Sequence, residues 1–72
     1  MLQLDLSGFD CPLPVLKTKK FLATIDAGVQ LEVITTDPAS LFDLQDFCIK
    51  TGHKLISQTQ TGPIIKTIIE HR

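Results

Sequence analysis

Pro12 and Pro14, directly after Cys11, most restrict what this chain can fold into. Residues 2–6 alternate leucine with polar side chains, which is the period of a half-buried strand. Residues 12–25 place apolar side chains at helical spacing. Proline is accepted in the first turn of a helix, because amides there have no intrahelical acceptor. The two prolines therefore predict a strand-to-helix junction with the cysteine at its centre.

A second junction of the same kind follows. Residues 29–36 are rich in β-branched side chains and form the strongest predicted strand, and Gly28 before them suits a turn. Asp37 can cap a helix, and Pro38 can occupy its first position. We expect that helix to run from residue 38 to about residue 50, with its core face made by a set that includes Leu41, Leu44, Phe47 and Cys48.

The last third of the chain predicts an antiparallel hairpin. Residues 54–60 form a weaker strand, Gly62 and Pro63 mark a turn, and residues 64–70 form a strong strand. The pairs Ile64/Ile68 and Ile65/Ile69 point to opposite faces, and the pattern leaves open which pair is buried. The other pair stays partly exposed and is a candidate surface for weak self-association of a chain that we otherwise expect to be a monomer.

The resulting order is βαβαββ. A strand, a helix and a further strand predict a right-handed unit with parallel strands. Two helices on one face of a four-stranded mixed sheet give the simplest packing, so the expected fold class is α+β, a two-layer α/β sandwich. The length of 72 residues predicts one domain over residues 1–72.

Composition excludes several classes of protein. The net charge of −1 and the absence of tryptophan and tyrosine argue against direct nucleic-acid binding. No apolar stretch approaches the roughly 20 residues that a membrane span needs. Two cysteines do not make a disulfide framework, and no signal peptide is visible, so we expect a cytoplasmic protein with reduced thiols.

The position of Cys11 predicts a reactive thiol. A helix start favours a thiolate, whereas the negative charge of the adjacent Asp10 opposes it, so we expect only a modest change of the thiol pKa. Thiol exchange needs thiolate, nucleophilicity and access. Lys17, Lys19 and Lys20 offer a positive rim to an acidic partner, the alternative being a solvated helix face.

The other thiol and the two histidines suggest structural positions. Cys48 falls on an apolar helix face and is expected in the core, while His53 lies in the turn before a strand and His71 in a frayed terminus. The spacing of these side chains lacks any Cys-x₂-Cys or His-x₃-His pair, so no metal site is expected.

The motif that begins at Gly8 and continues Cys-Pro-X-Pro resembles that of the TusA/SirA-like sulfur-carrier family. Nearly all of the 72 residues are similar to the family's pattern. Beyond the motif, the similar segments are Asp37-Pro38-Ala39, Gly52-His53 and Gly62-Pro63.

This resemblance implies a carrier of sulfane sulfur, held as a persulfide on Cys11, of the sulfurtransferase type. The implied partners are a cysteine desulfurase or rhodanese-like donor and an acceptor protein with its own cysteine, and no cofactor is required. tRNA thiolation, molybdenum-cofactor biosynthesis and sulfur oxidation are the pathways that such proteins serve. We expect the sulfur site to be supported by Gly8, Pro12, Pro14 and Asp37.

Two positions depart from the family's pattern. Some members carry a basic residue where this chain has Asp10, and some carry an acidic residue where it has Leu13. Both positions flank the sulfur, so the partners that family members choose are not transferred to this chain. The alternative function is a non-catalytic redox-sensing or regulatory module that uses an exposed Cys11, and a nucleic-acid module is a third possibility.

Overall fold

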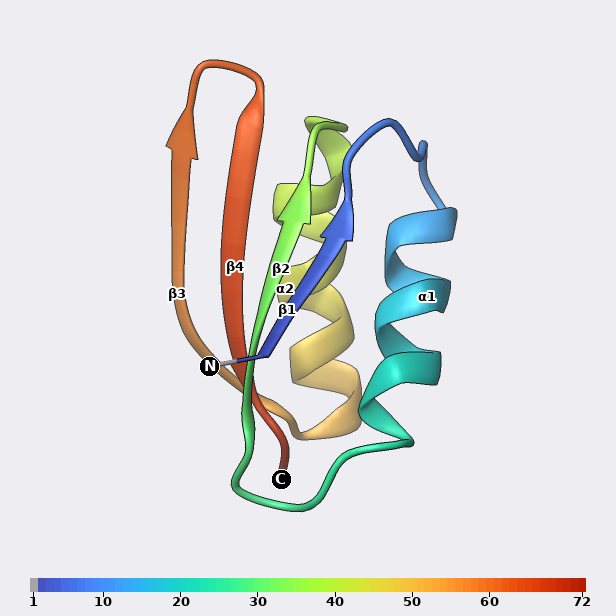
Figure 1. Cartoon of the computed structure of the whole chain (residues 1–72), viewed down its shortest axis with the longest axis vertical. Coiled ribbons are helices and arrows are strands. Elements are labelled where there is room, and N and C mark those ends of the chain that lie inside the picture. Colours follow the sequence, from blue (N-terminus) through green and yellow to red (C-terminus); the bar gives the residue numbers. More distant parts are fainter. Residues whose placement is uncertain (1) are drawn as a thin grey trace.

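The computed structural model describes residues 2–72 and has the predicted order of elements (Figure 1). The first four elements alternate between strand and helix, as the two junction motifs require. In chain order they are β1 (Leu2–Leu6), α1 (Leu13–Leu22), β2 (Gln30–Thr35), α2 (Ala39–Thr51), β3 (Lys54–Thr61) and β4 (Ile64–Glu70). No helix within residues 2–72 is long and apolar enough to cross a membrane.

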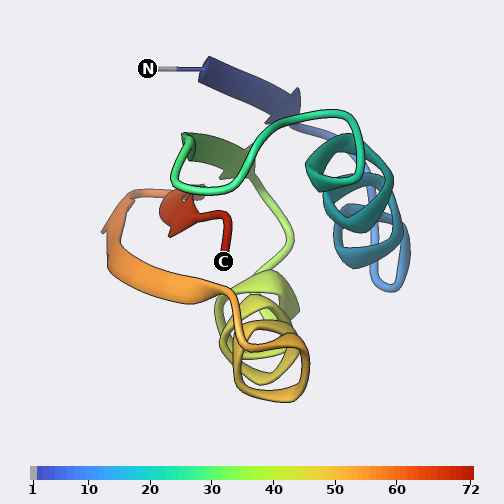
Figure 2. The same cartoon turned by 90° about the horizontal axis from the view of Figure 1, so that it is seen from below.

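The four strands form one mixed sheet in the order β1-β2-β4-β3. β1 and β2 are parallel, whereas β4 runs antiparallel to both β2 and β3. The predicted hairpin of β3 and β4 is thus confirmed, with one irregularity of register between Leu55 and Ser57. Figures 1 and 2 show α1 and α2 on the same face of this sheet, which confirms the predicted α+β two-layer architecture.

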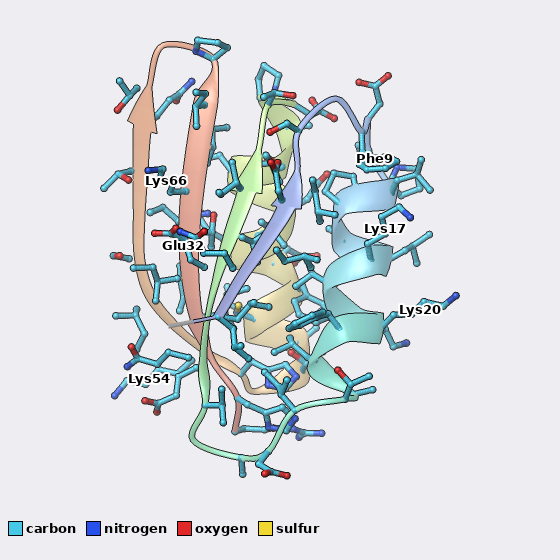
Figure 3. All side chains as sticks on the ribbon, viewed as in Figure 1. Phe9, Lys17, Lys20, Glu32, Lys54 and Lys66 are labelled. Carbon is cyan, nitrogen blue, oxygen red and sulfur yellow. The ribbon has the colours of Figure 1, made fainter. Side chains whose placement is uncertain are left out.

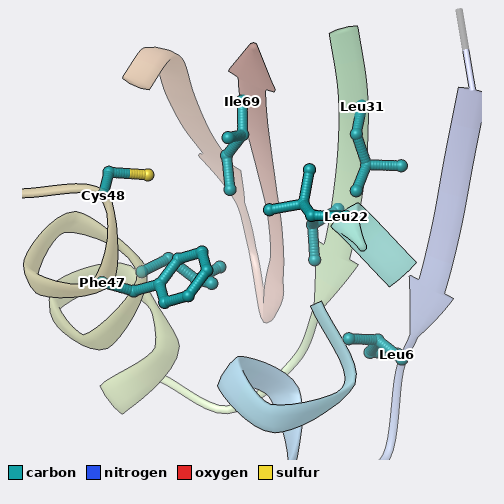
Figure 4. Close-up of a cluster of buried hydrophobic side chains, with 8 residues drawn as sticks. Leu6, Leu22, Leu31, Phe47, Cys48 and Ile69 are labelled. Carbon is teal, nitrogen blue, oxygen red and sulfur yellow. The ribbon is translucent and has the colours of Figure 1, made fainter. Parts of the chain in front are cut away.

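The core lies between the sheet and the two helices (Figure 4). β2 contributes alternate side chains, so Leu31 and Val33 are fully buried, and Leu22 and Leu44 face them from the helices. Val15, Phe21 and Ile25 pack against this cluster as partly buried neighbours. Aliphatic side chains thus fill most of the core, with Phe47 as its aromatic member.

The strand pairing settles which isoleucine pair of β4 is buried. Ile69 lies opposite Leu31 of β2 and Leu55 of β3, so it shares their face of the sheet. Ile65 and Ile69 are 1% and 0% exposed, whereas Ile64 is 42% exposed. The pair Ile64/Ile68 lies on the face that the helices leave uncovered. Its use in self-association stays a prediction.

The first helix is shorter than its sequence pattern predicts. It was expected to reach residue 25, but α1 ends at Leu22. The amides of Thr24 and Ile25 bond to the carbonyls of Phe21 and Leu22, three residues back, and the Thr24 hydroxyl also donates to the Phe21 carbonyl. These tighter turns satisfy the last carbonyls of the helix. Ile25 still packs on the core, which explains why the apolar pattern continued past the helix.

The expectation of a frayed C-terminus at His71 was wrong. The His71 amide donates to the Val29 carbonyl at 2.9 Å, and the Gly28 amide donates to the His71 carbonyl at 2.8 Å. These two bonds continue the pairing of β2 and β4 beyond the ends of both strands. A sequence pattern could not show this, because the partners are more than forty residues apart.

His53 makes the stability of the fold depend on pH. Its ring stacks on Phe47 at 5.7 Å, meets His71 edge-on at 4.8 Å, and its Nδ1 accepts the Arg72 amide at 3.2 Å. Burial lowers the pKa of His53 below its ordinary value of 6.5, and the charges of His71 and Arg72 lower it further. The folded chain therefore binds fewer protons than the unfolded chain between the lowered pKa and 6.5.

We expect the free energy of unfolding to fall as the pH drops through this range, and to be restored above it. Urea unfolding midpoints at several pH values between about 7.5 and about 5.5 would measure this change. Ordinary carboxylates titrate below this pH range, so they do not obscure the effect of His53. His53→Phe keeps a ring on Phe47 but cannot be protonated, so its midpoint should change less with pH. An equal slope for both proteins would contradict the assignment to His53.

Candidate functional site

Cys11 lies exposed between β1 and α1, at the end of the molecule where the two parallel strands finish. Its peptide bond to Pro12 is cis. The Leu13 amide donates to the Asp10 carbonyl at 2.9 Å, and α1 begins at Leu13 with Pro12 as its N-cap. Pro14 is buried in the first turn. Pro14 therefore lies in the first turn, as the sequence predicted, whereas Pro12 is the N-cap one residue before the helix; the thiol lies in front of both.

The two strand-to-helix junctions are joined by hydrogen bonds. The Gly8 amide donates to the Thr36 hydroxyl at 2.9 Å, and the Cys11 amide donates to Asp37 Oδ2 at 2.6 Å. The other carboxylate oxygen, Asp37 Oδ1, accepts the amide of Ala39, the first residue of α2. Because β1 and β2 are parallel, their carboxyl ends meet at one edge of the sheet, and Asp37 links both helix starts there.

Asp37→Ala should loosen both junctions. The variant loses the acceptor for the Cys11 amide and the acceptor at the start of α2. Asp37 precedes Pro38, the N-cap of α2, and accepts the amide of the first helical residue. Loss of an acceptor at a helix start typically costs about 0.5–2 kcal/mol, so we expect the free energy of unfolding to fall by an amount in this range. Asp37→Asn keeps one carbonyl oxygen, so its free energy of unfolding should lie between that of the wild type and that of Asp37→Ala. Urea unfolding measures both, and equal stability of the three proteins would contradict the linking role.

Asp43, which the sequence analysis did not single out, contacts the thiol directly. The Cys11 thiol donates to Asp43 Oδ2 with 2.8 Å between Sγ and the oxygen. Asp43 lies in the second turn of α2, on the side that faces α1. The available signal was its position six residues after Asp37, but which side of a helix faces its neighbour depends on tertiary packing.

These carboxylates raise the pKa of the Cys11 thiol. The hydrogen bond to Asp43 is the largest cause, followed by partial loss of hydration and by the negative charges of Asp43 and Asp37. The sequence predicted that Asp10 would oppose the helix start; Asp10 is not among the groups that act on the thiol. The opposing charge therefore exists, but it comes from Asp37 at the second junction and from Asp43 in α2.

A groove of about 470 Å³ runs from Cys11 between the two helices. Val15, Leu16 and Phe47 line its apolar part, and Pro12 lies beside the sulfur. Its charged lining residues are Lys19, Asp43, Asp46 and Lys50, of which Lys50 and Asp46 form an ion pair at 2.9 Å. The thiol is therefore accessible along an open groove and not enclosed.

The three predicted partner lysines are spread along α1. Lys17 Nζ lies over the Phe9 ring at 4.7 Å from its centre, and Figure 3 shows Lys17 and Lys20 extending from the helix. Lys19 borders the groove that contains Cys11, whereas Lys17 and Lys20 do not. All three border a second groove, of about 530 Å³, on α1, together with the exposed Leu13 and Leu16.

The second cysteine takes no part in this site. Cys48 is 4% exposed in the core, which confirms the sequence prediction, and burial raises the pKa of its thiol. Both cysteines are free thiols. Within residues 2–72 no group of three His, Cys, Asp or Glu side chains is placed to hold a metal ion.

Fold and site together define a class of small two-layer α/β proteins that present a cysteine at a strand-to-helix junction. A solved structure of this class is the SirA-like protein from Desulfitobacterium hafniense. It matches with a TM-score of 0.84 and 28% identity over 97% of this chain and 96% of that one. The predicted SirA-like fold is thus confirmed.

The chain belongs to the family described as sulfurtransferase TusA, whose sequence model matches residues 2–71. The sulfur carrier protein TusA of Allochromatium vinosum is 43% identical over 60 residues, which cover 83% of this chain and 79% of that protein. A putative sulfur carrier protein of Neisseria meningitidis serogroup A is 36% identical over 96% of this chain and 93% of its own length. YrkI of Bacillus subtilis, also a putative sulfur carrier protein, is 39% identical over 93% of this chain and 89% of its own length.

The predicted family and the predicted sulfur-carrier role are confirmed by these matches. A sulfur carrier works between two other proteins, one that donates the sulfur and one that accepts it.

Proposed function

We propose that this chain carries sulfane sulfur as a persulfide on Cys11 and passes it to a cysteine of an acceptor protein. One observation carries the assignment to this residue: Cys11 is exposed at the mouth of a groove, whereas Cys48 is 4% exposed. A persulfide must be reached by a donor and then by an acceptor, and both exchanges require access to the sulfur. Cys11 offers that access and Cys48 does not.

The residues around Cys11 hold it in place without enclosing it. Asp37 accepts its amide, Pro12 and Pro14 open the helix behind it, and Gly8 turns the chain after β1. Gly8 has a φ of +85°, which side chains other than glycine rarely adopt. We assign these four residues the role of supporting the sulfur site.

The proposed partners are a cysteine desulfurase or rhodanese-like donor and an acceptor with its own cysteine. Lys17, Lys19 and Lys20, with the exposed Leu13 and Leu16 between them, form the proposed partner surface. We propose that residues 1–72 act as one domain, a cytoplasmic monomer without a cofactor, in tRNA thiolation, molybdenum-cofactor biosynthesis or other sulfur metabolism.

A redox-sensing module is the weaker alternative. Sensor cysteines have lowered pKa values, because the thiolate is the form that reacts with oxidants. The carboxylate of Asp43 instead raises the pKa of Cys11. The site therefore disfavours the thiolate that reacts with oxidants, and it favours a thiol that reacts with a partner protein.

The mass of the loaded protein tests the proposal. After incubation with a cysteine desulfurase and cysteine, the chain should gain the mass of one sulfur atom under non-reducing conditions. Dithiothreitol should remove the added mass, and peptide analysis should place it on Cys11. Reversible oxidation of Cys11 without any gain of sulfur would contradict the carrier role and favour the sensing module.

A further inference from the structure

We propose that Asp43 is a catalytic residue whose carboxylate holds the proton of the resting Cys11 thiol and accepts it when the sulfur attacks its donor. This inference rests on the proposed persulfide at Cys11. It assigns a role to a residue that lies 32 positions away in the sequence and approaches only because α1 and α2 pack side by side.

The geometry holds Cys11 at two points. Its amide donates to Asp37 at 2.6 Å, and its thiol donates to Asp43 at 2.8 Å. The first bond restrains the backbone and the second restrains the orientation of the side chain. Cys11 nevertheless stays exposed, so the sulfur can be approached from solvent while Asp43 lies behind it.

Among the charged groups of residues 2–72 near the sulfur, only Asp43 is placed to accept the proton of the Cys11 thiol. Asp46 is engaged by Lys50 in an ion pair at 2.9 Å. Asp37 uses one oxygen for the Cys11 amide and the other for the Ala39 amide. The remaining charged lining residue is Lys19, which cannot accept a proton from a thiol while it is itself protonated. Asp43 is thus the carboxylate whose oxygen meets the sulfur.

The transfer step balances without an added oxidant or reductant. The Cys11 sulfur attacks the outer sulfur of the donor persulfide, forming a new S–S bond. The S–S bond of the donor breaks, and the donor cysteine leaves as a thiolate. The proton of Cys11 passes to the Asp43 carboxylate and from there to the departing thiolate. The products are the Cys11 persulfide and the donor thiol.

The same carboxylates favour release of the cargo. A persulfide is more acidic than a thiol, so the loaded sulfur tends to be an anion. An anion beside the Asp43 and Asp37 carboxylates is disfavoured by like-charge repulsion. The site therefore stabilises the unloaded thiol over the anionic loaded form, as a carrier that must hand on its sulfur requires.

Alkylation of Cys11 by iodoacetamide tests the hydrogen bond, because this reagent reacts with the thiolate. In Asp43→Asn the acceptor carboxylate is gone, so the alkylation rate at neutral pH should rise several-fold and its pH midpoint should move down. Asp46→Asn, in the same groove and helix but paired to Lys50, should behave as the wild type, and so should Asp10→Asn, next to Cys11 in sequence. Asp43→Glu should restore part of the wild-type profile.

Loading from glutathione persulfide tests the proton transfer. Under single-turnover conditions, the ratio of loading rate to alkylation rate should fall in Asp43→Asn, because the variant has more thiolate but no carboxylate to take up and return the proton. An unchanged alkylation midpoint in both Asp43→Asn and Asp43→Ala would overturn the proposal. Loading that rises in proportion to alkylation would also overturn it.

The two measurements separate this inference from the proposed function. Alkylation depends only on the thiol and its neighbours, so it reports on Asp43 whether or not the chain carries sulfur. Failure of the wild type to load would contradict the persulfide at Cys11, while an altered alkylation profile of Asp43→Asn would still demonstrate the hydrogen bond. Far-ultraviolet circular dichroism of each variant confirms that it is folded.

Discussion

We expect Cys11→Ser to abolish sulfur acceptance and to leave the fold intact. Serine is nearly isosteric with cysteine, but its hydroxyl does not form a persulfide. The side chain is exposed and lies outside the hydrophobic core, so the free energy of unfolding should change by no more than about 0.5 kcal/mol. Incubation with a desulfurase and radiolabelled cysteine should label the wild type, while the variant stays at the background of a reaction without enzyme.

Cys48→Ala is the matched control. It removes the other thiol of the chain, which is buried and far from any donor's reach. Some stability should be lost through the small cavity, but labelling should match the wild type. Equal labelling of the wild type and Cys11→Ser would contradict the proposed site, and loss of labelling in a folded Cys48→Ala would move the site to the core thiol.

Ile69→Ala destabilises the fold strongly. Ile69 is 0% exposed and lies opposite Leu31 and Leu55 in the sheet. Truncation of a fully buried isoleucine costs about 2–5 kcal/mol, through lost burial and through the cavity that remains. The total free energy of unfolding of a small domain is only about 5–15 kcal/mol, so this variant should lose a large share of its stability. Urea unfolding should show a lower midpoint with an unchanged m value.

Ile64→Ala provides the comparison within the same strand. Ile64 is 42% exposed on the uncovered face, so the cost should stay within about 1 kcal/mol, the range of strand propensity. Equal losses in the two variants would contradict the assignment of faces to β4. A change in oligomeric state of Ile64→Ala at high concentration would, in addition, support the predicted self-association through this face.

The secondary structure of this chain is strongly determined by local patterns. Leucine alternation in β1, β-branched residues in β2 and a proline at each helix start predicted the order βαβαββ. The end of α1 was placed three residues too late, because Ile25 continues the apolar pattern. That side chain reaches the core from a tight turn as well as it would from a helix, so periodicity alone cannot distinguish the two.

The candidate site was predictable in part. The sequence analysis expected Asp37 to support the sulfur site, and a 2.6 Å hydrogen bond joins its carboxylate to the Cys11 amide, because parallel strands end at one edge of the sheet. The expectation that the charge of Asp10 would oppose the thiolate was wrong, because adjacency in sequence does not ensure that two side chains meet. The thiol meets Asp43 instead, and that contact depends on how α2 is rotated against α1.

The sequence by itself determined the elements, the class of fold, the exposed cysteine and the family. These depend on local spacing and on the motif, which are present in the unfolded chain as well. Only the tertiary structure decided which isoleucine pair is buried, that His71 extends the sheet, and which carboxylate accepts the hydrogen bond of the Cys11 thiol. Each depends on strand register or helix packing between residues far apart in sequence. Cys11-Pro12-Leu13-Pro14 thus places a thiol at a helix start, and tertiary packing brings a carboxylate of the other helix into hydrogen-bond contact with it.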